Sequence, residues 1–346
     1  MVELNGKKIL VTFLMHLGDL TLTTPFIHAL RKAAPDAHIT MLVDEKLKDV
    51  VLFNPYLDEV VTIDKKGRDN SILSLWACSR HLSKLDFDVL INLHPNERCS
   101  FIDAMTSVKL RTGTTHKIFK WFWDVFTPLD RSMHAADMYL DVLQQLGVQD
   151  LSSNGLEIFP GEEHFLEAEL FWQEQNITDQ DKLIGFNIGS AVPTKRWPPE
   201  RFAEVADIFA AKGYKTVFFG GTMDEEMVAE ATGYMQTRPI IATGHFAIGG
   251  LAAAMRRCCL IITNDSGPMH VAISQKVPIV AMYGPSNPKL YGPYTKDAVI
   301  VTAQPPCQGC ADGMKHSCDD LQCMSRMTVK QVVEAADTML ERGVEK

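Results

Sequence analysis

Three features that define broad classes of protein are missing from this sequence. No apolar run approaches the roughly 18 to 20 residues that a membrane-spanning helix requires. There is no basic excess, because 34 Lys and Arg stand against 43 Asp and Glu, and a net charge of −9 argues against a general nucleic-acid-binding protein. A short apolar run follows Lys7 and Lys8, but no small-residue cleavage site follows it, which argues against a signal peptide. We therefore expect a cytoplasmic protein.

The composition that remains is that of an ordinary globular protein, with 46% apolar residues in 346. Single hydrophobic cores stop growing at roughly 250 to 300 residues, so the length predicts two domains. Eight cysteines in a reducing compartment favour a metal or redox site over a disulfide framework.

Short runs of Val, Ile, Leu and Phe alternate with amphipathic stretches in both halves of the chain. Strands this apolar, separated by helices, indicate parallel sheets covered on both faces. A polar passage at residues 151–161 separates the halves, so we predict two doubly wound α/β domains. A closing helix at about residues 329–342 has the length to pack back toward the N-terminal domain. The expected strands lie at residues 9–14, 38–43, 59–63 and 89–93, then at 183–188, 216–219, 260–263 and 279–282.

Ligands of such sheets bind outside the carboxyl ends of the strands, so the loops after strands carry the candidate sites. The first of these loops, residues 16–25, contains Gly18, where the backbone can turn tightly, and Asp19 at a helix start. Asp19 is either an N-cap or a base that accepts a proton from an attacking hydroxyl group.

Two loops of the second half suit a phosphate group. The chain at residues 263–270 reads as a strand end followed by a helix start, whose backbone N–H groups and dipole bind phosphate, although a capped helix start is the simpler interpretation. The loop at residues 189–198 carries Lys195 and Arg196, which either neutralise a diphosphate or are merely solvated. No GxGxxG or Walker motif is present, which argues against a dehydrogenase.

Together these loops resemble the heptosyltransferases of glycosyltransferase family 9, over nearly the whole chain. The resemblance implies a GT-B fold of two doubly wound Rossmann-like domains facing a central cleft. Residues 1–160 would bind the acceptor and residues 161–346 the nucleotide sugar. The reaction implied is transfer of heptose from ADP-heptose to a lipopolysaccharide inner-core acceptor. The matching segments are Gly18-Asp19, Thr24-Pro25, Lys195 with Trp197-Pro198, residues 264–270, and Tyr283-Gly284-Pro285-Ser286.

The same resemblance assigns roles to individual residues. Asp19 matches the family's catalytic base and Lys195 the lysine that contacts the donor phosphates. The implied mechanism is a direct displacement with inversion, in which Lys195 and the helix start after Asp265 stabilise the departing ADP. Ser266 stands where the family usually has Thr and keeps the hydroxyl group. The expected donor-binding residues are Gly18, Ser190, Lys195, Asp224, Glu225, Phe246, Asp265, Ser266, Gly267 and His270, with either Asp224 or Glu225 at the ribose and Phe246 near the adenine.

Two Asp-x-Asp sequences could hold the divalent ion that some nucleotide-sugar enzymes use. They lie at residues 86–88 and 179–181, and both precede strands, which puts them at the wrong end of the sheet. We therefore expect catalysis without a metal ion or other cofactor.

A stretch between Asp103 and Asp124 contains no acidic residue. Cations followed by interfacial aromatic residues suit an anionic lipid-linked acceptor or a peripheral membrane surface. Alternatively, the aromatic residues are core and the cations a solvated face. The expected acceptor-binding residues are Lys109, Arg111, Lys117 and Lys120, followed by Trp121-Phe122-Trp123.

A second cluster, of cysteines, follows Pro305-Pro306. Four thiolates at short spacing can hold zinc or iron in a tetrahedral site, with His316 as a substitute ligand, or they remain unligated on a loop. Cys78, Cys99, Cys258 and Cys259 fit small core residues instead. The cluster comprises Cys307, Cys310, Cys318 and Cys323.

Two other functions stay open at this point. One is transfer of heptose or another sugar to a protein or a different glycan. The other is a non-catalytic nucleotide-sugar-binding scaffold, against which the presence of both Asp19 and Lys195 argues.

Overall fold

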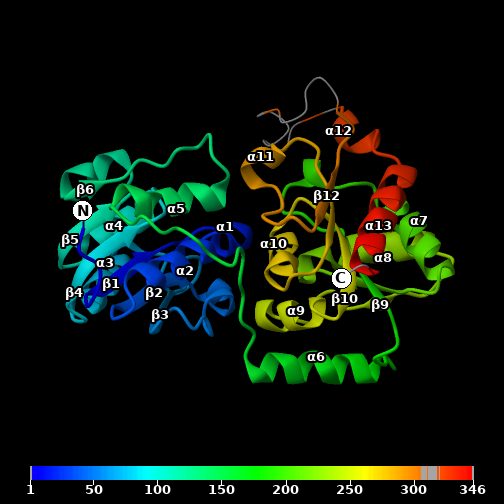
Figure 1. The fold of residues 1–346 in the computed structure, drawn as a ribbon, viewed down its shortest axis with the longest axis horizontal. Helices are drawn as coiled ribbons and strands as arrows, with labels where there is room; N and C mark the ends of the chain where they lie inside the picture. The colour runs from blue at the N-terminus through cyan, green and yellow to red at the C-terminus, as the bar shows by residue number, and fades with distance from the viewer. Residues whose placement is uncertain (1, 305–309, 311–317, 319, 345–346) are drawn as a thin grey trace. The chain divides into compact units, whose positions relative to one another are not determined.

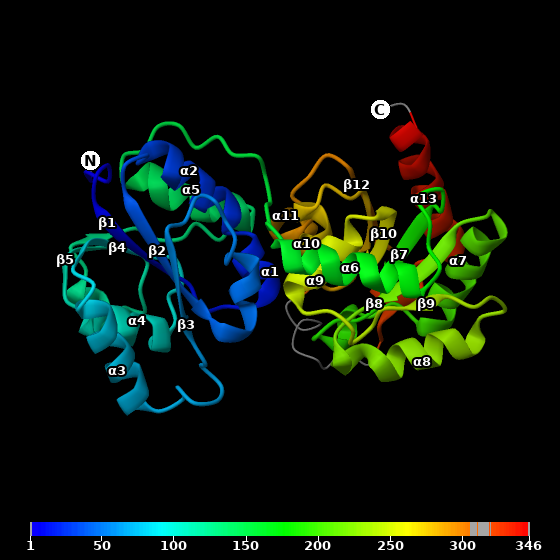
Figure 2. The same cartoon turned by 90° about the horizontal axis from the view of Figure 1, so that it is seen from below.

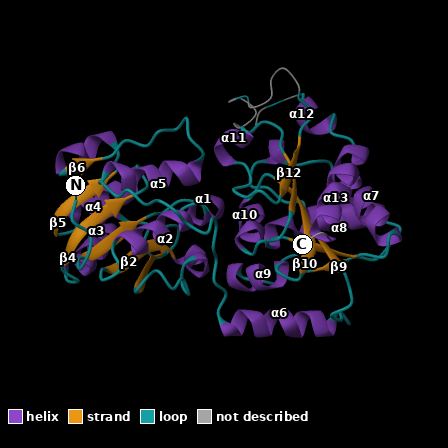
Figure 3. Cartoon of the chain, in the orientation of Figure 1, coloured by secondary structure: helices purple, strands orange, loops and turns teal. Residues whose placement is uncertain are grey.

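The computed structural model describes residues 2–304, 310, 318 and 320–344. The chain divides into two compact units, Met1–Phe159 and Pro160–Lys346, one residue from the predicted boundary. Each unit is a six-stranded, fully parallel sheet flanked by helices (Figures 1 and 3). The two doubly wound Rossmann-like domains expected from the sequence are therefore confirmed.

Unit 1 has the strand order β3-β2-β1-β4-β5-β6. Its strands are β1 (Lys8–Thr12), β2 (His38–Asp44), β3 (Glu59–Ile63), β4 (Phe87–Asn92), β5 (Val108–Gly113) and β6 (Val125–Phe126). Its helices are α1 (Leu17–Thr21), α2 (Thr24–Ala33), η1 (Glu45–Val50), α3 (Ile72–Ser83), α4 (Glu97–Met105), η2 (Lys117–Phe122) and α5 (Ala135–Gln145). Helices α2 and α5 lie on one side of the sheet and α3 and α4 on the other (Figure 2).

Unit 2 has the strand order β12-β11-β10-β7-β8-β9. Its strands are β7 (Leu183–Asn187), β8 (Lys215–Phe219), β9 (Ile240–Ile241), β10 (Cys258–Asn264), β11 (Ile279–Met282) and β12 (Ala298–Val301). Its helices are α6 (Glu162–Glu174), η3 (Pro193–Lys195), α7 (Pro199–Ala211), η4 (Thr222–Asp224), α8 (Glu225–Tyr234), α9 (Ile248–Met255), α10 (Gly267–Ser274), α11 (Pro288–Tyr291), α12 (Gln322–Ser325) and α13 (Val329–Val344).

The central strands are apolar along their length because helices cover both of their faces. Leu10 of β1 packs with Leu42, Leu90, Leu82 of α3 and Ile102 of α4. Its neighbours in the strand point to the opposite face and are equally enclosed, as the 0% exposure of Ile9 and Val11 requires. A strand of this kind leaves no room for polar side chains except at its ends.

In each unit, two loops lie at the topological switch point of the sheet, where strands are added first on one side of the starting strand and then on the other. In unit 1 these loops follow β1 and β4, which are neighbours, and in unit 2 they follow β7 and β10. Ligands of open parallel sheets bind at such points. The predicted loops at residues 16–25, 189–198 and 263–270 all lie there.

Helix α13 uses its apolar face inside unit 2. Val332, Ala336 and Met339 join the core cluster that also contains Val205 and Phe209 of α7. Its packing toward the N-terminal domain stays a prediction.

Candidate active site

The loops after β7 and β10 bring Lys195 and Asp265 together. The Lys195 ammonium nitrogen lies 2.7 Å from Asp265 Oδ2, and the two side chains are 13% and 6% exposed. Ser286 Oγ also donates a hydrogen bond to this carboxylate, from the loop after β11. Lys195 and the first residue after β10 therefore form a nearly buried ion pair at the carboxyl edge of the sheet. Asp265 orients one N–H of the ammonium, and an ammonium carries three.

Residue Ser266 stands at the N-cap position of α10, yet it does not cap that helix in the described structure. Its hydroxyl oxygen accepts a hydrogen bond of 2.7 Å from Asn187 Nδ2, at the end of β7. Capping by the Ser266 side chain, one form of the simple capped helix start, is therefore absent. Pro268 has no N–H and the Met269 N–H donates to the Ser266 carbonyl at 3.2 Å, so the Gly267 N–H is the donor that the start of α10 offers to an anion.

Asn264 holds the two loops in register. Its side-chain nitrogen donates to the Ile188 carbonyl at 2.7 Å, and its oxygen accepts from the Trp197 backbone N–H at 3.1 Å. Ser190 donates to the Asp265 carbonyl at 3.4 Å and accepts from the Val192 N–H. Ser190 is thus a brace of this loop pair, a role that the sequence motif does not reveal.

The two acidic residues proposed for the ribose occupy different environments. Asp224 is buried, its carboxylate accepts the Gly221 N–H at 2.9 Å, and burial raises its pKa. A side chain at Gly189 would collide with this carboxylate, so Asp224 lies against the loop after β7. Glu225 is exposed, and its carboxylate lies beside Gly244, where a side chain would meet it.

Phe246 lies in an aromatic group between β9 and α9. Its ring contacts Phe171 of α6 edge-on, with a centroid distance of 5.0 Å, and His245 at 4.7 Å. His270 is buried in α10, one turn after Gly267. The structure therefore collects the predicted donor-binding residues of the second half around the carboxyl edge of one sheet.

In unit 1 two expectations about the first loop are wrong. Gly18 has no positive φ and lies inside α1, because the connection from β1 turns before Leu17. Asp19 is not the N-cap of that helix, since His16 occupies the cap position with extended backbone. Asp19 lies instead in the first turn of α1, partly exposed, beside the carboxyl end of β1.

The same edge carries a histidine that the sequence analysis missed. His94 follows β4, is 7% exposed and packs its ring 5.7 Å from that of Phe13. Burial, helped by the charges of Lys65 and His16, lowers its pKa to about 4, so the imidazole is neutral at pH 7. A polar residue directly after a buried strand was the available signal.

Asp103 of α4 is a second buried polar residue that the sequence analysis missed. Its side chain is fully buried, and Thr12 at the end of β1 donates to it at 2.8 Å. Desolvation raises its pKa to about 8, so this carboxyl group is protonated at neutral pH. Its hydrogen bond joins α4 to β1 beneath the edge.

Two of the four predicted acceptor-binding cations serve the fold instead. Lys109 pairs with Asp88 at 2.7 Å at the amino end of the sheet, where Asp88 also accepts the Lys8 N–H. Arg111 donates to the Asp103 and Thr106 carbonyls and so ties the end of α4 to β5. Both belong to strand β5, whose charged residues hide it from the apolar pattern.

The other two cations lie on η2, together with exposed apolar side chains. Trp121 is 95% exposed, Ile118 57% and Phe122 46%, and the Lys120 ammonium lies 4.5 Å from the ring centroid of Phe126. Trp123, by contrast, is buried and donates to the Thr112 carbonyl at 3.0 Å. We call Lys117, Ile118, Lys120, Trp121, Phe122 and Phe126 the η2 surface. Within the part of the chain that the structure describes, no helix is long and apolar enough to cross a membrane.

Of the cysteine cluster, Cys307 and the substitute ligand His316 lie outside the described residues. Cys310 and Cys318 are partly exposed, whereas Cys323 is buried in the core of unit 2. Among described residues, no three His, Cys, Asp or Glu side chains are grouped as a metal site would require. Cys99 and Cys258 are buried, as expected of small core residues, and Cys78 and Cys259 are partly buried.

Two doubly wound Rossmann-like sheets in one chain are the GT-B architecture, and the second sheet carries a lysine and a helix start at its carboxyl edge. The family model for glycosyltransferase family 9 (heptosyltransferase) matches residues 75–318. The chain therefore belongs to this family.

Relatives and solved structures agree with that assignment. Lipopolysaccharide heptosyltransferase 3 of Escherichia coli K12 is 23% identical over 297 residues, which cover 82% of this chain and 84% of the relative. The crystal structure of the glycosyl transferase family 9 from Veillonella parvula DSM 2008 is 52% identical, with a TM-score of 0.94 over 99% of both chains. E. coli heptosyltransferase WaaC with ADP has a TM-score of 0.73 at 16% identity, covering 96% of this chain and 99% of WaaC.

The lowered pKa of His94 makes a stability prediction. The pKa of His94 is about 4 in the folded protein, against the ordinary value of 6.5 in the unfolded chain. Protonation of this imidazole therefore favours the unfolded state as the pH falls from 6.5 to 4. We expect the free energy of unfolding of the wild type, relative to His94→Gln, to fall by up to about 3 kcal/mol between pH 6.5 and 4. Urea unfolding across this range measures it, and parallel pH curves for the two proteins would contradict the assignment.

Proposed function

We propose that this protein transfers heptose from ADP-heptose to a lipopolysaccharide core acceptor, with inversion at the anomeric carbon. The observation that carries the proposal is the Lys195–Asp265 ion pair next to the start of α10, in a chain of the heptosyltransferase family. Both features suit a leaving group that departs with negative charge.

The donor half of the proposal rests on unit 2. Lys195 and the Gly267 N–H at the start of α10 would hold the diphosphate, because a cation and a helix start both favour anionic oxygens. The exposed carboxylate of Glu225 suits the ribose hydroxyls better than that of Asp224, which is buried against its own loop. Phe246, in its aromatic group, would contact the adenine ring.

The chemical step would use Asp19 as the general base. As the acceptor oxygen forms its bond to the anomeric carbon, its proton passes to the Asp19 carboxylate and the electron pair of the breaking bond leaves with ADP. A base of this kind typically contributes 10² to 10⁴ in rate. Its position in the first turn of α1, at the carboxyl edge and partly exposed, is compatible with the role.

The acceptor would be lipid-linked and bound through the η2 surface. This surface combines two lysines with four exposed apolar side chains and follows the carboxyl end of β5. Aromatic residues flanked by cations partition into the headgroup region of anionic bilayers. The protein would then work on the cytoplasmic side of the membrane, bound at its periphery.

Two alternatives use the same donor site. A protein or different glycan acceptor would keep Asp19 and Lys195 but not the η2 surface. A non-catalytic scaffold would bind the nucleotide sugar without releasing ADP, so ADP release with purified acceptor separates it from the enzyme.

Catalysis would need no divalent ion. Both Asp-x-Asp sequences lie at amino ends of strands, where Asp88 is paired with Lys109 and Asp181 accepts the Thr178 N–H and hydroxyl group. A structural zinc or iron at the cysteine cluster is a separate proposal, supported by the spacing of its thiolates, and metal analysis of freshly purified protein tests it.

Replacement of the base and of the phosphate ligand should have different kinetic effects. We expect Asp19→Asn to lower kcat about 10²- to 10⁴-fold with little change in the Kd of ADP-heptose. Lys195→Met should raise the Kd of ADP-heptose and ADP about tenfold or more. ADP-release kinetics and calorimetry measure both effects. Lys215→Met, an exposed lysine at the amino end of β8, is the matched control.

The identity of the donor is tested by ligand-induced thermal stabilisation. Because the shift follows RT ln(1 + [L]/Kd), ADP-heptose and ADP should raise Tm more than UDP-sugars at equal concentration. A larger shift with a UDP-sugar would overturn the donor assignment.

Charge reversal on the η2 surface should weaken acceptor binding without affecting donor binding. We expect Lys117→Glu combined with Lys120→Glu to weaken binding to anionic vesicles and lipid acceptor at least tenfold, and to leave ADP binding unchanged. Sedimentation with phosphatidylglycerol vesicles measures this. Lys215→Glu with Lys296→Glu carries the same charge change on exposed residues of unit 2. Equal acceptor affinity in both double variants would refute the role of the surface.

Metal independence is tested by chelation. Transfer activity should be the same in excess EDTA and in magnesium. Loss of activity in EDTA that magnesium restores would contradict catalysis without a metal ion.

A further inference from the structure

Lys65, just after β3, is a cation that neither the motif nor the proposed mechanism uses. Its side chain is only 13% exposed, and its ammonium has three partners. It donates to the Leu14 carbonyl at 2.7 Å and to the Met15 carbonyl at 2.9 Å, and it lies 3.0 Å from Asp44 Oδ2. An ammonium has three N–H donors, so all of them are engaged within the protein. The Lys65 ammonium therefore binds groups of the protein itself and is not a solvated cation.

The two carbonyls that Lys65 holds belong to the connection between β1 and α1. Phe13 still follows the sheet, because its N–H donates to the Leu42 carbonyl at 3.0 Å. After it the chain turns away, and His16 begins α1, whose first turn contains Asp19. Fixing two consecutive carbonyls restricts rotation of the peptide units that lead into this short helix.

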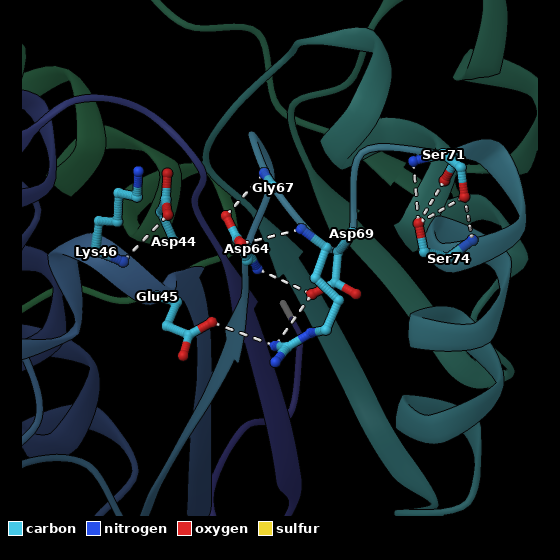
Figure 4. Close-up of polar contacts among 9 residues, drawn as sticks. Asp44, Glu45, Lys46, Asp64, Gly67, Asp69, Ser71 and Ser74 are labelled. Atoms are coloured by element: carbon cyan, nitrogen blue, oxygen red, sulfur yellow. Dashed lines mark hydrogen bonds and ion pairs between the residues drawn. The ribbon is translucent and has the colours of Figure 1, made fainter.

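Asp44, the ion-pair partner of Lys65, and Asp64, its neighbour in the chain, both accept further hydrogen bonds (Figure 4). The second carboxylate oxygen of Asp44 accepts the Lys46 N–H at 3.2 Å and so caps η1. Asp64 accepts the N–H groups of Gly67 and Arg68, at 2.9 and 3.0 Å, which folds the loop after β3 back on itself.

Two contacts from neighbouring elements add to these. The Arg68 guanidinium pairs with Glu45 of η1 at 3.2 Å. On the other side, Arg98 of α4 donates to the Lys65 carbonyl. The ammonium is thus presented from a loop that is braced against β2, η1 and α4.

We propose that Lys65 is a positioning residue for transfer, because its ammonium clamps the β1–α1 connection and so sets the place and direction of the Asp19 carboxylate. The inference rests on the proposed role of Asp19 as base. Misplacement of a reacting group by about 1 Å can cost on the order of 10²-fold in rate. The clamp joins the ends of three strands: Asp44 is the last residue of β2, Leu14 and Met15 follow β1, and Lys65 follows β3.

The test removes the whole ion pair rather than one partner. Lys65→Met alone would leave the Asp44 carboxylate buried without its counter-charge, which destabilises the fold. The double variant Asp44→Asn, Lys65→Met avoids this, and asparagine still caps η1. Lys48→Met, an exposed lysine of the same unit, is the matched control.

We expect the double variant to lose about 10- to 100-fold in kcat, with the KM of ADP-heptose within twofold of wild type. Amide hydrogen exchange of residues 14–20 should become at least tenfold faster, while peptides from the rest of unit 1 and from unit 2 keep their rates. The control should match the wild type in both measurements.

Unchanged kcat in the double variant, or unchanged exchange at residues 14–20, would overturn the positioning role. Faster exchange spread evenly over unit 1 would overturn it as well, because it would indicate general destabilisation. If the wild type released no ADP from ADP-heptose with acceptor, the proposed function would fail, and the exchange measurement would still decide whether Lys65 holds the connection.

Discussion

Burial of both faces of two parallel sheets is the constraint on which the rest of this structure depends. Strand residues such as Leu10 and Ile184 are fully enclosed, so the faces of the sheets cannot present polar groups to a ligand. Polar chemistry is confined to the ends of the strands, and the carboxyl edge adds the N–H groups of the helices that follow. Asp19 and Asp265 both occupy that edge, each beside the central strands of its own sheet.

Buried ammonium–carboxylate pairs define the geometry at both edges. Lys195 with Asp265 and Lys65 with Asp44 each join a loop cation to an aspartate at or just after a strand end, and all four side chains are at most 13% exposed. The cost of desolvation leaves such pairs little net stability, so what they supply is a defined direction for each charged group. This explains how a protein of net charge −9 can present positive charge to an anion: the cations are few and held in place.

Much of the fold was predictable because a strand enclosed on both faces is a continuous apolar run. The strands expected at residues 9–14 and 183–188 are β1 and β7, and the boundary expected at residue 160 lies one residue from the observed one. Strand β5 was not predicted, because Lys109 and Arg111 interrupt its apolar pattern. The two-residue strands β6 and β9 are too short to show any period. In the candidate site, Lys195 and Asp265 were found as charged residues after strands, whereas His94 and Lys65 were not.

The sequence by itself determined the alternation of elements, the two-domain organisation and the family, because these depend on local patterns and on the order of motifs along the chain. Only the tertiary structure decided which charged groups meet. Lys109 faces Asp88 at the wrong edge for an acceptor, Ser266 turns to Asn187 instead of capping α10, and Lys65 reaches carbonyls 50 and 51 positions away. Those contacts follow from strand order, which brings loops distant in sequence to one edge, and partners at such separations leave no local signature in the chain.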